Sequence, residues 1–303
     1  MINIYIKSFN RPFYLDRCIR SVKFNVTGHS KIIVLDDGTP STFIERIRQL
    51  HPDVEIRSSG ADDGKVELLR QEKFQEIERL YPSALDFWTR EVKSDSNRYC
   101  LILEDDAWIV RRLDLSPLVQ NLESNEVVIC KLWWSNHVHK TTERYSCSSG
   151  PTIEYFDPIY DSSKGASSIW IVAFALFRRD YWLNCVSKAR RLADERSQLV
   201  AASDFANRHS TVRFAKTEKR VVHQGWMIPA RSTSEYYDRG LVQHLYMDAL
   251  NEAWAAGRLD SSEGYPFDFS KPAVLSVLRE ALPENAVRVW EEWHEREIKY
   301  YYD

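Results

Sequence analysis

Acidic residues gather at two points of the sequence where a β-strand is expected to end. An Asp-Asp pair at 36–37 follows the apolar run 31–35, and a Glu-Asp-Asp triplet at 104–106 follows the run 99–103. Adjacent carboxylates repel unless a positive group joins them. All-oxygen ligands favour Mg²⁺ or Mn²⁺, which also take oxygens from a substrate phosphate. The two acidic groups therefore predict metal-assisted phosphate chemistry, and a solvated turn or a helix start is the alternative interpretation of the triplet.

Glycine is scarce, and its positions exclude the usual phosphate-binding loops. The chain has 10 glycines in 303 residues, and no three of them follow the GxGxxG order of a dinucleotide fold. The segment 60–65, Gly-Ala-Asp-Asp-Gly-Lys, is one residue short of a Walker loop and continues into Val66 instead of Ser or Thr. If the protein binds a phosphate group, a metal ion or side chains must therefore neutralise its charge.

The elements that must position these acids alternate over the first 132 residues. Apolar runs predict strands at 2–6, 31–35, 54–57, 99–103 and 127–132, and apolar spacing or end signals predict helices from Pro12, at 42–51 and at 66–80. The helix at 42–51 is expected to begin with a capping box of Thr42 and Glu45. This order predicts an α/β fold with a mostly parallel sheet and helices on both faces. Ligands bind beyond the carboxyl ends of such strands, so both acidic groups are expected to face one crevice.

The pattern after residue 132 is less regular. Residues 135–163 are polar and predict a loop or lid, and 165–177 is a long uncharged run that predicts a buried strand. A helix is expected at 181–199 and a short strand at 220–223. Beyond residue 240 the chain becomes helical and amphipathic.

The composition restricts which ligands the protein binds and where in the cell we expect it. The net charge is -3 and no long basic run occurs, so the chain is not expected to bind a nucleic-acid polymer. The five cysteines form no CxxC pair, which favours reduced thiols over a disulfide frame or a zinc site. The longest uncharged run, 165–177, is shorter than the roughly 20 residues that a membrane helix needs. We expect a cytoplasmic protein, with the inner face of the membrane as an alternative location.

Three motifs at the predicted strand ends together resemble a known family. SFNRP at 8–12, LDDGT at 35–39 and LEDD at 103–106 are similar to the signatures of GT-A nucleotide-sugar glycosyltransferases, particularly those of family 2. The resemblance implies a GT-A fold and the transfer of a sugar from a nucleotide diphosphate sugar, a UDP-sugar by preference, to an acceptor hydroxyl. It also implies inversion, a role in polysaccharide biosynthesis, and Mn²⁺ or Mg²⁺ as cofactor.

The resemblance also implies a role for particular residues. Asp36 would bind the base, Asp106 with Asp105 would ligate the metal, and His223 would complete the metal shell. Further donor-binding candidates are Ser8, Asn10, Arg11, Asp37, Lys65, Glu104 and Arg231. His223 has a purely structural interpretation as an alternative, and the segment that contains Arg231 has that of an ordinary polar turn.

The acceptor side is expected further along the chain. The resemblance implies Asp204 as the general base, although Ser203 stands where the family usually has an acid. Asp157 and Asp161 are the competing candidates. The chain is rich in aromatic residues (13%), and Trp133, Trp134 and Trp170 are the candidate acceptor platforms, with core packing as the alternative.

We expect a catalytic domain at 1–235, with a nucleotide half at 1–132 and an acceptor half at 133–235, and a helical extension at 236–303. The extension is expected to pack on the catalytic domain or on a second subunit, and contact with a membrane carrying a lipid-linked acceptor is the alternative.

Two other functions stay open. One is a metal-dependent sugar nucleotidyltransferase, and the other is a non-catalytic glycan-binding module.

Overall fold

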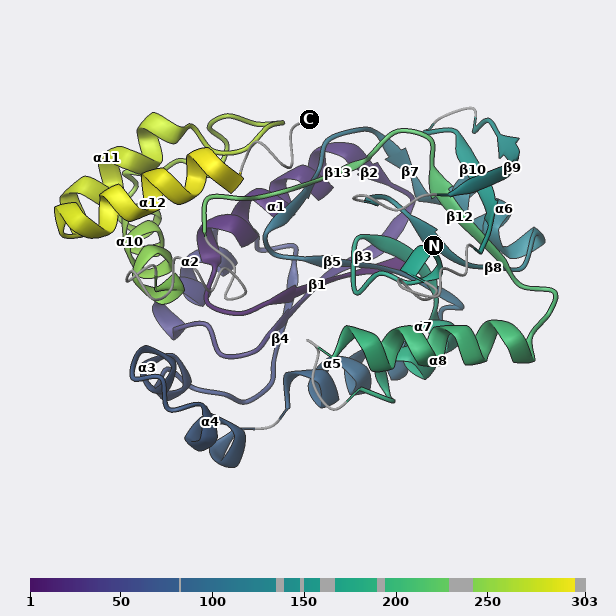
Figure 1. The fold of residues 1–303 in the computed structure, drawn as a ribbon, viewed down its shortest axis with the longest axis horizontal. Coiled ribbons are helices and arrows are strands. Elements are labelled where there is room, and N and C mark those ends of the chain that lie inside the picture. Colours follow the sequence, from purple (N-terminus) through teal and green to yellow (C-terminus); the bar gives the residue numbers. More distant parts are fainter. Residues whose placement is uncertain are drawn as a thin grey trace.

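A nine-stranded sheet runs through the computed structural model (Figure 1), in the order β4-β3-β1-β5-β11-β8-β12-β10-β9. The structure describes residues 1–81, 83–134, 139–147, 150–158, 167–189, 194–228 and 242–297. This mixed α/β architecture, with its helical C-terminal region, confirms the predicted fold class.

The first part of the sheet is parallel and corresponds closely to the predicted strands. It comprises β1 (Ile2–Ser8), β3 (His29–Asp36), β4 (Glu55–Ser58) and β5 (Tyr99–Glu104). In the register of these strands Ser8 lies opposite Asp36, and Lys7 lies opposite Glu104. The carboxyl ends of β1, β3 and β5 therefore meet at one edge, where the acidic groups follow them.

The second part of the sheet is mixed. It contains β11 (Ala175–Arg178), β8 (Val127–Lys131), β12 (Arg213–Thr217), β10 (Ile153–Asp157) and β9 (Lys140–Tyr145). The interpretation of residues 135–163 as a loop was wrong where β9 and β10 lie. Every residue of β9 is exposed, so an edge strand of this kind carries no apolar alternation that the sequence could reveal.

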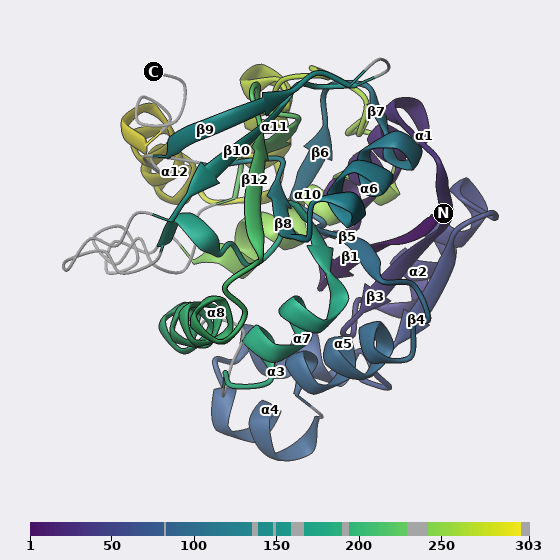
Figure 2. The same cartoon turned by 90° about the vertical axis from the view of Figure 1, so that its right-hand side faces the viewer.

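Helices cover both faces of the sheet, and Figure 2 shows α1 and α6 on one face with α5 and α7 on the other. The helices before the C-terminal region are α1 (Pro12–Asn25), α2 (Ser41–Leu50), α3 (Gly64–Arg70), α4 (Phe74–Leu80), α5 (Ala84–Lys93), α6 (Leu115–Ser124), α7 (Arg179–Val186) and α8 (Glu195–Arg208). Two small sheets join β2 (Val26–Thr27) to β7 (Leu113–Asp114) and β6 (Ala107–Ile109) to β13 (Val222–Gln224).

Several predicted helices have different bounds. The helix expected at 66–80 is divided into α3 and α4, because Glu72 takes a positive φ of 57° that an α-helix does not allow. The helix expected at 181–199 is likewise two helices, α7 and α8. The capping box was wrong, since α2 follows Pro40 and no side chain caps it.

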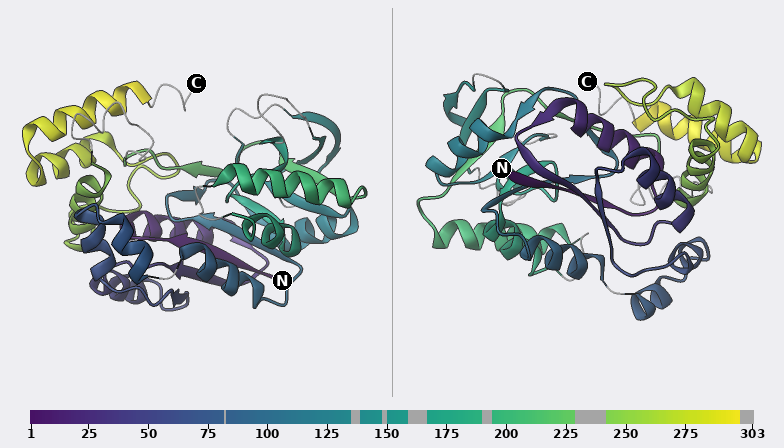
Figure 3. Two further views of the ribbon diagram at one scale, coloured as in Figure 1. Left: turned by 60° about the horizontal axis from the view of Figure 1, so that its bottom comes forward. Right: turned by 180° about the vertical axis from the view of Figure 1, so that it is seen from behind.

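The C-terminal region packs against the helices of the first part. Its elements are α10 (Gln243–Ala255), α11 (Lys271–Ala281) and α12 (Glu284–Glu297). Helix α10 lies beside α1 and α2, α11 packs on α10, and α12 packs on α11 (Figures 1 and 3). Tyr246, Leu250 and Trp254 belong to the same buried cluster as β1 and α1. None of the described helices is both long and apolar enough to cross a bilayer.

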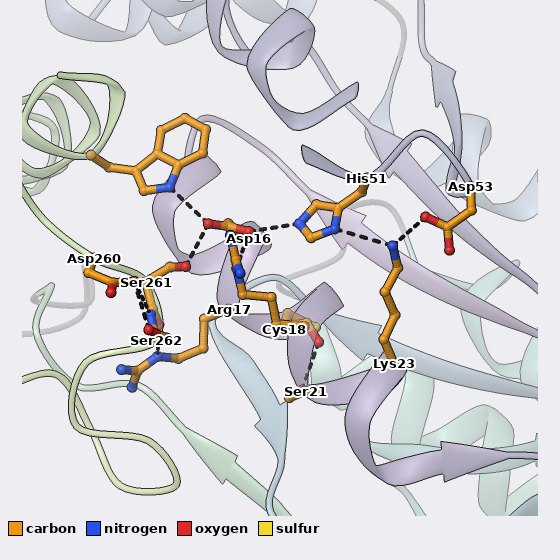
Figure 4. Close-up of polar contacts among 12 residues, drawn as sticks. Asp16, Arg17, Cys18, Ser21, Lys23, His51, Asp53, Asp260, Ser261 and Ser262 are labelled. Carbon is orange, nitrogen blue, oxygen red and sulfur yellow. Dashed lines mark hydrogen bonds and ion pairs between the residues drawn. The ribbon is translucent and has the colours of Figure 1, made fainter. Parts of the chain in front are cut away.

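Buried polar contacts fasten this region to α1 (Figure 4). The Asp16 carboxylate accepts hydrogen bonds from Trp254 Nε1 (3.0 Å), from the Ser261 hydroxyl (2.5 Å) and, on its other side, lies 2.7 Å from His51 Nε2. The next residue, Arg17, donates to the backbone oxygens of Ser261 and of residues 263 and 267. The helix that follows the first strand-end motif is thus held by residues about 240 positions away.

Candidate active site

The acidic groups lie on either side of the end of β1, as the strand order predicts. The backbone N–H of Asp37 donates to Ser8 O at 3.0 Å, and that of Asp105 donates to Lys7 O at 3.0 Å. Ser8, Asp36 and Asp105 are all buried. The three motifs therefore meet at one edge of the sheet, with the 8–12 segment between the other two.

Arg11 joins the two carboxylates that were expected to ligate a metal. It is the N-cap residue of α1, and its guanidinium lies between them, with Nη2 2.7 Å from Asp105 Oδ1 and Nη1 2.6 Å from Asp106 Oδ2. Burial raises the pKa of Asp105 to about 7, against the opposing effect of Arg11, and it also raises the pKa of Asp106. Burial would lower the pKa of Arg11, but the carboxylates raise it well above its ordinary value.

The donor set fits a hard divalent cation. Asp105 Oδ2 accepts from the backbone N–H of Phe9 at 3.1 Å, whereas Asp106 Oδ1 is buried and has no hydrogen-bond partner among the described residues. Mg²⁺ is commonly bound by one or two carboxylates together with substrate phosphates and waters. Asp105 and Asp106 satisfy that requirement. No third His, Cys, Asp or Glu joins them in a metal-binding group within the described part of the chain.

His223 lies in β13, opposite Trp108 of β6, and its ring is 5.0 Å from the Trp108 ring. Burial and the charges of Arg17 and Arg220 lower its pKa to about 4, so this imidazole is neutral near pH 7. The structure does not group His223 with Asp105 and Asp106. Its role as a metal ligand stays a prediction.

Asp36 and Asp37 have different surroundings. The Asp36 carboxylate accepts from the N–H groups of Gly38 (3.3 Å) and Thr39 (3.2 Å), and burial raises its pKa to about 6. Asp37 forms an ion pair with Lys65, whose ammonium also lies 4.9 Å from the centre of the Phe9 ring. The predicted donor residue Lys65 is thus brought to the end of β3.

Glu104, the last residue of β5, is paired with a residue of β1: its carboxylate lies 2.9 Å from Lys7 Nζ. The same ammonium is 5.2 Å from the centre of the Trp88 ring. Burial would raise the pKa of Glu104, but Lys7 lowers it below its usual value. Glu104 is therefore an ionised carboxylate with its own cation.

Asn10 is held from both sides. It takes a φ of 51°, its N–H donates to Thr39 Oγ1 at 2.9 Å, and its backbone oxygen accepts from Asn251 Nδ2 at 2.9 Å. Asn251 belongs to α10, which has no counterpart among the three motifs. Sequence reasoning missed this residue, because nothing in its local sequence distinguishes it.

A hollow of about 280 Å³ opens beside Arg11. Its walls come from the first motif, from α3 and α4, and from the start of α10: Phe9, Arg11, Leu69, Glu72, Phe74, Val242, Gln243, His244 and Met247. The ion pair between Arg70 and Asp248, at 2.7 Å, ties α3 to α10 across it. The C-terminal region therefore forms one wall of this hollow, which the sequence did not predict.

The predicted acceptor residues are distributed differently. Trp133 packs on Phe174, with ring centres 5.9 Å apart, and the Lys216 ammonium lies 4.6 Å from the Trp134 ring. Trp170 requires a correction: it is 4% exposed and donates to Gln198 Oε1, so it packs in the core and offers no open platform. Its apolar surroundings in 165–177 were consistent with either interpretation.

The two candidate bases that the structure describes are exposed. Asp157 ends β10, at the side of the sheet next to the edge strand β9. Asp204 lies on α8 and lines a hollow of about 470 Å³ together with Lys188, Arg196 and Arg208; residues 104–106 are not part of that lining. Arg231 and Asp161 lie outside the described residues.

One further carboxylate near this site had no sequence signal. Asp268, which lies between α10 and α11 in the sequence, accepts from the N–H groups of Trp226 (2.6 Å) and Phe269 (2.8 Å). Burial raises its pKa to about 6, and the charge of Asp106 contributes to this rise. The C-terminal region thus adds a buried acid to the surroundings of Asp106.

A family model covers most of this site. Residues 3–183 match the model described as Glycosyl transferase family 2. The match includes the motifs at 8–12, 35–39 and 103–106, and it ends before Asp204 and His223. No curated protein matches the chain.

Solved structures of similar fold include that of S. aureus TarS 1-349 in complex with UDP-GlcNAc, which is 9% identical, with a TM-score of 0.47 and coverage of 100% of this chain and 76% of that chain. Another is glucosyl-3-phosphoglycerate synthase from Mycobacterium tuberculosis in complex with Mn²⁺, UDP and phosphoglyceric acid. It is 12% identical, with a TM-score of 0.45 and coverage of 85% of this chain and 78% of that chain.

Proposed function

The chain belongs to glycosyl transferase family 2, and from this premise we propose that it transfers a sugar from a nucleotide diphosphate sugar to a hydroxyl group of a glycan or other acceptor, with inversion and with the help of Mn²⁺ or Mg²⁺. The observation that carries the proposal is the buried pair Asp105–Asp106 at the end of β5, held by Arg11 beside an open hollow.

Donor binding is supported by the groups that surround the end of β1. The hollow beside Arg11 has aromatic walls in Phe9 and Phe74, on which a base could stack. Arg11 offers a planar set of donors suited to the oxygens of a diphosphate, and Lys65 adds a second cation nearby. Asp36 is the acceptor that we propose for the base.

Asp105 and Asp106 are the residues that would hold the divalent cation, as the unpartnered oxygen of Asp106 supports. When bound there, such a cation would act as a Lewis acid and neutralise charge on the leaving diphosphate. Glu104 is already paired with Lys7, so we do not assign it to the metal.

The transfer itself requires one bond to form as another breaks. The acceptor oxygen attacks the anomeric carbon from the face opposite the diphosphate, and the bond between that carbon and the diphosphate oxygen breaks with its electron pair on the diphosphate. The proton of the acceptor hydroxyl passes to a general base, for which we keep Asp204. Trp133 and Trp134 are the proposed acceptor platforms.

The decisive experiment is a screen of nucleotide sugars with and without Mn²⁺, read by thermal unfolding, followed by analysis of the products. A ligand that binds the folded state raises the melting temperature. We expect a rise that requires both the donor and the metal, and release of nucleoside diphosphate when an acceptor is added. Release of pyrophosphate would instead identify a nucleotidyltransferase, and sugar binding without nucleotide or metal a glycan-binding module.

A further inference from the structure

The metal ligands of the proposed site already have a cation of their own. Asp105 is fully buried, and the side chains of Asp106 and Arg11 are 14% and 23% exposed. The guanidinium contacts one oxygen of each carboxylate, at 2.7 and 2.6 Å. Hydrogen bonds between a guanidinium and carboxylates are charge-assisted and roughly twice as strong as neutral ones.

A divalent cation and this guanidinium compete for the two carboxylates, because Arg11 occupies one oxygen of each acid and Phe9 N–H occupies the second oxygen of Asp105. Metal–oxygen bonds to Mg²⁺ are about 2.1 Å long, so the ion sits closer to the carboxylates than the guanidinium nitrogens do. The two cations would also repel each other across the same pair of carboxylates. A divalent cation that binds both acids therefore weakens their contacts with the guanidinium.

The Arg11 side chain has a second neighbour besides the two carboxylates. Arg11 also lines the hollow of about 280 Å³. Its backbone is fixed, because Leu15 N donates to Arg11 O at 2.9 Å and Asn251 holds the preceding residue. Arg11 therefore contacts the carboxylates and lines the hollow at the same time, from a backbone that neighbouring residues hold in place.

We propose that Arg11 is a resident counter-ion that competes with the divalent cation for Asp105 and Asp106, so that the metal and the donor diphosphate bind together, with Arg11 moving from the carboxylates to the diphosphate. This inference rests on the proposed function, because it takes the metal site and the donor as given. It adds an order to the binding: the free protein has little affinity for the metal alone.

The coupling has to be reciprocal. If the nucleotide releases the carboxylates by engaging Arg11, it raises the affinity for the metal, and the metal must raise the affinity for the nucleotide by the same factor. Direct contact between the metal and the diphosphate contributes to the same coupling, so the role of Arg11 is measured by the difference between the unchanged protein and an Arg11 variant.

The test is calorimetric titration of the whole chain with MnCl₂ alone, with UDP or GDP alone, and with each nucleotide in the presence of MnCl₂. For the unchanged protein we expect Mn²⁺ to bind at least about tenfold more tightly when nucleotide is present, which corresponds to a coupling of about 1.4 kcal/mol. In Arg11→Gln we expect Mn²⁺ alone to bind at least about tenfold more tightly than in the unchanged protein, and the nucleotide to bind more weakly with Mn²⁺ present.

Arg20→Gln is the matched control. Arg20 lies on the same helix, and its Nε is 2.8 Å from the buried carboxylate of Asp16, yet it contacts neither Asp105 nor Asp106. We expect its titrations to equal those of the unchanged protein. If Arg11→Gln does not fold, Arg11→Lys, which keeps the charge but not the bridge, takes its place with the same expectation of tighter metal binding.

The outcomes separate this inference from the proposed function. If the unchanged protein binds Mn²⁺ with nucleotide but neither Arg11 variant binds Mn²⁺ alone more tightly, the competition is wrong and the metal role stands. If Mn²⁺ binds under no condition and sugar transfer proceeds in a chelator, the metal role in the proposed function is wrong, and the competition is wrong with it.

Discussion

The charged residues at the ends of β1 and β5 form two separate ion-pair groups. Lys7 pairs with Glu104, and Arg11 pairs with both Asp105 and Asp106. Two positive and three negative charges leave a formal charge of -1 if all are ionised. Burying an uncompensated charge is costly, which is why the pKa values of Asp105 and Asp106 rise even with Arg11 in place. A divalent cation that took the place of Arg11 would neutralise both carboxylates.

Asp106→Asn tests whether the Asp106 carboxylate binds the metal. The amide cannot supply the anionic oxygen that a hard cation requires, so we expect metal-dependent affinity for the nucleotide to fall by about 100-fold. Titration of nucleotide with and without Mn²⁺ measures it. Asp53→Asn, which changes an exposed acid paired with Lys23, is the control and should bind normally. Equal nucleotide affinity with and without Mn²⁺ in the unchanged protein would refute the assignment.

Asp204→Asn tests the proposed base. Removing a general base typically lowers turnover by about 10²- to 10⁴-fold, whereas donor binding should be nearly unchanged, because this residue is predicted to act on the acceptor. Steady-state kinetics and donor titration measure the two effects. Glu195→Gln changes another acid of α8 and should leave turnover intact. Loss of donor binding with normal turnover per bound donor would contradict the role.

The raised pKa of Asp36 predicts that the stability of the protein depends on pH. Burial raises its pKa from the ordinary 3.8 to about 6, so the folded protein holds a proton there between those pH values and the unfolded chain does not. Ionisation of Asp36 therefore costs stability as pH rises from about 4 to 6. Asp36→Asn keeps an acceptor oxygen for Gly38 and Thr39 and removes this cost.

The free energy of unfolding of Asp36→Asn, minus that of the unchanged protein, should rise by on the order of 2 kcal/mol as the pH rises from 4 to 7. Urea denaturation at several pH values measures it. Asp53→Asn is the control of opposite sign, since Lys23 lowers the pKa of that exposed acid. A difference between Asp36→Asn and the unchanged protein that does not vary with pH would contradict the prediction.

At the scale of elements, α1 connects the site to the C-terminal region. Pro12 begins the helix directly after Arg11, and Asp16 and Arg17 in its second turn receive the contacts from residues 254–267. The helix therefore has little freedom to shift, and the change of partner that we propose for Arg11 would involve its side chain alone.

Arg17→Met tests the hydrogen bonds that hold α1 to the C-terminal region. The substitution keeps an unbranched apolar stem but leaves the backbone oxygens of Ser261 and Phe267 without their donor, so we expect a loss of about 3 kcal/mol in the free energy of unfolding. Chemical denaturation measures it. Lys31→Met removes an exposed ion pair with Glu55 and should cost less than about 1 kcal/mol. Equal stability of the two variants would show that the hydrogen bonds of Arg17 are unimportant.

At the scale of the whole molecule, one buried cluster extends from the sheet into α10, α11 and α12. It includes Tyr246, Trp254, Val274 and Trp290, and Trp290 also donates to Met227 O at 2.9 Å. The division at residue 235 is a prediction about folding units, and the shared core argues that the two parts stabilise each other.

A chain that ends at residue 235 tests this dependence. It would expose the apolar faces of α1 and α2 that α10 covers and would lose the Asn251 contact to Asn10. We expect it to aggregate or to bind a dye specific for apolar surface, and circular dichroism with gel filtration measures this. A stable, monomeric, cooperatively unfolding fragment would show that the first 235 residues fold independently.

The sequence predicted the features that depend on neighbours along the chain. The strands that end at Ser8, Asp36 and Glu104 could be read from short apolar runs, and their shared edge follows from the parallel order of the strands. It could not predict β9, whose residues are all exposed, or the break between α3 and α4. In both cases the backbone conformation depends on a neighbouring strand or on the local turn, and the apolar pattern does not report it.

By itself, therefore, the sequence determined the fold class and the position of the acids at one edge of the sheet, because strand periodicity and strand-end motifs are local properties. The tertiary structure alone decided that Arg11 bridges Asp105 and Asp106, that Asn251 holds the first motif and that Trp170 is buried. These contacts join residues 28 to 241 positions apart, and the free energy that selects them comes from burial and charge pairing in the folded chain.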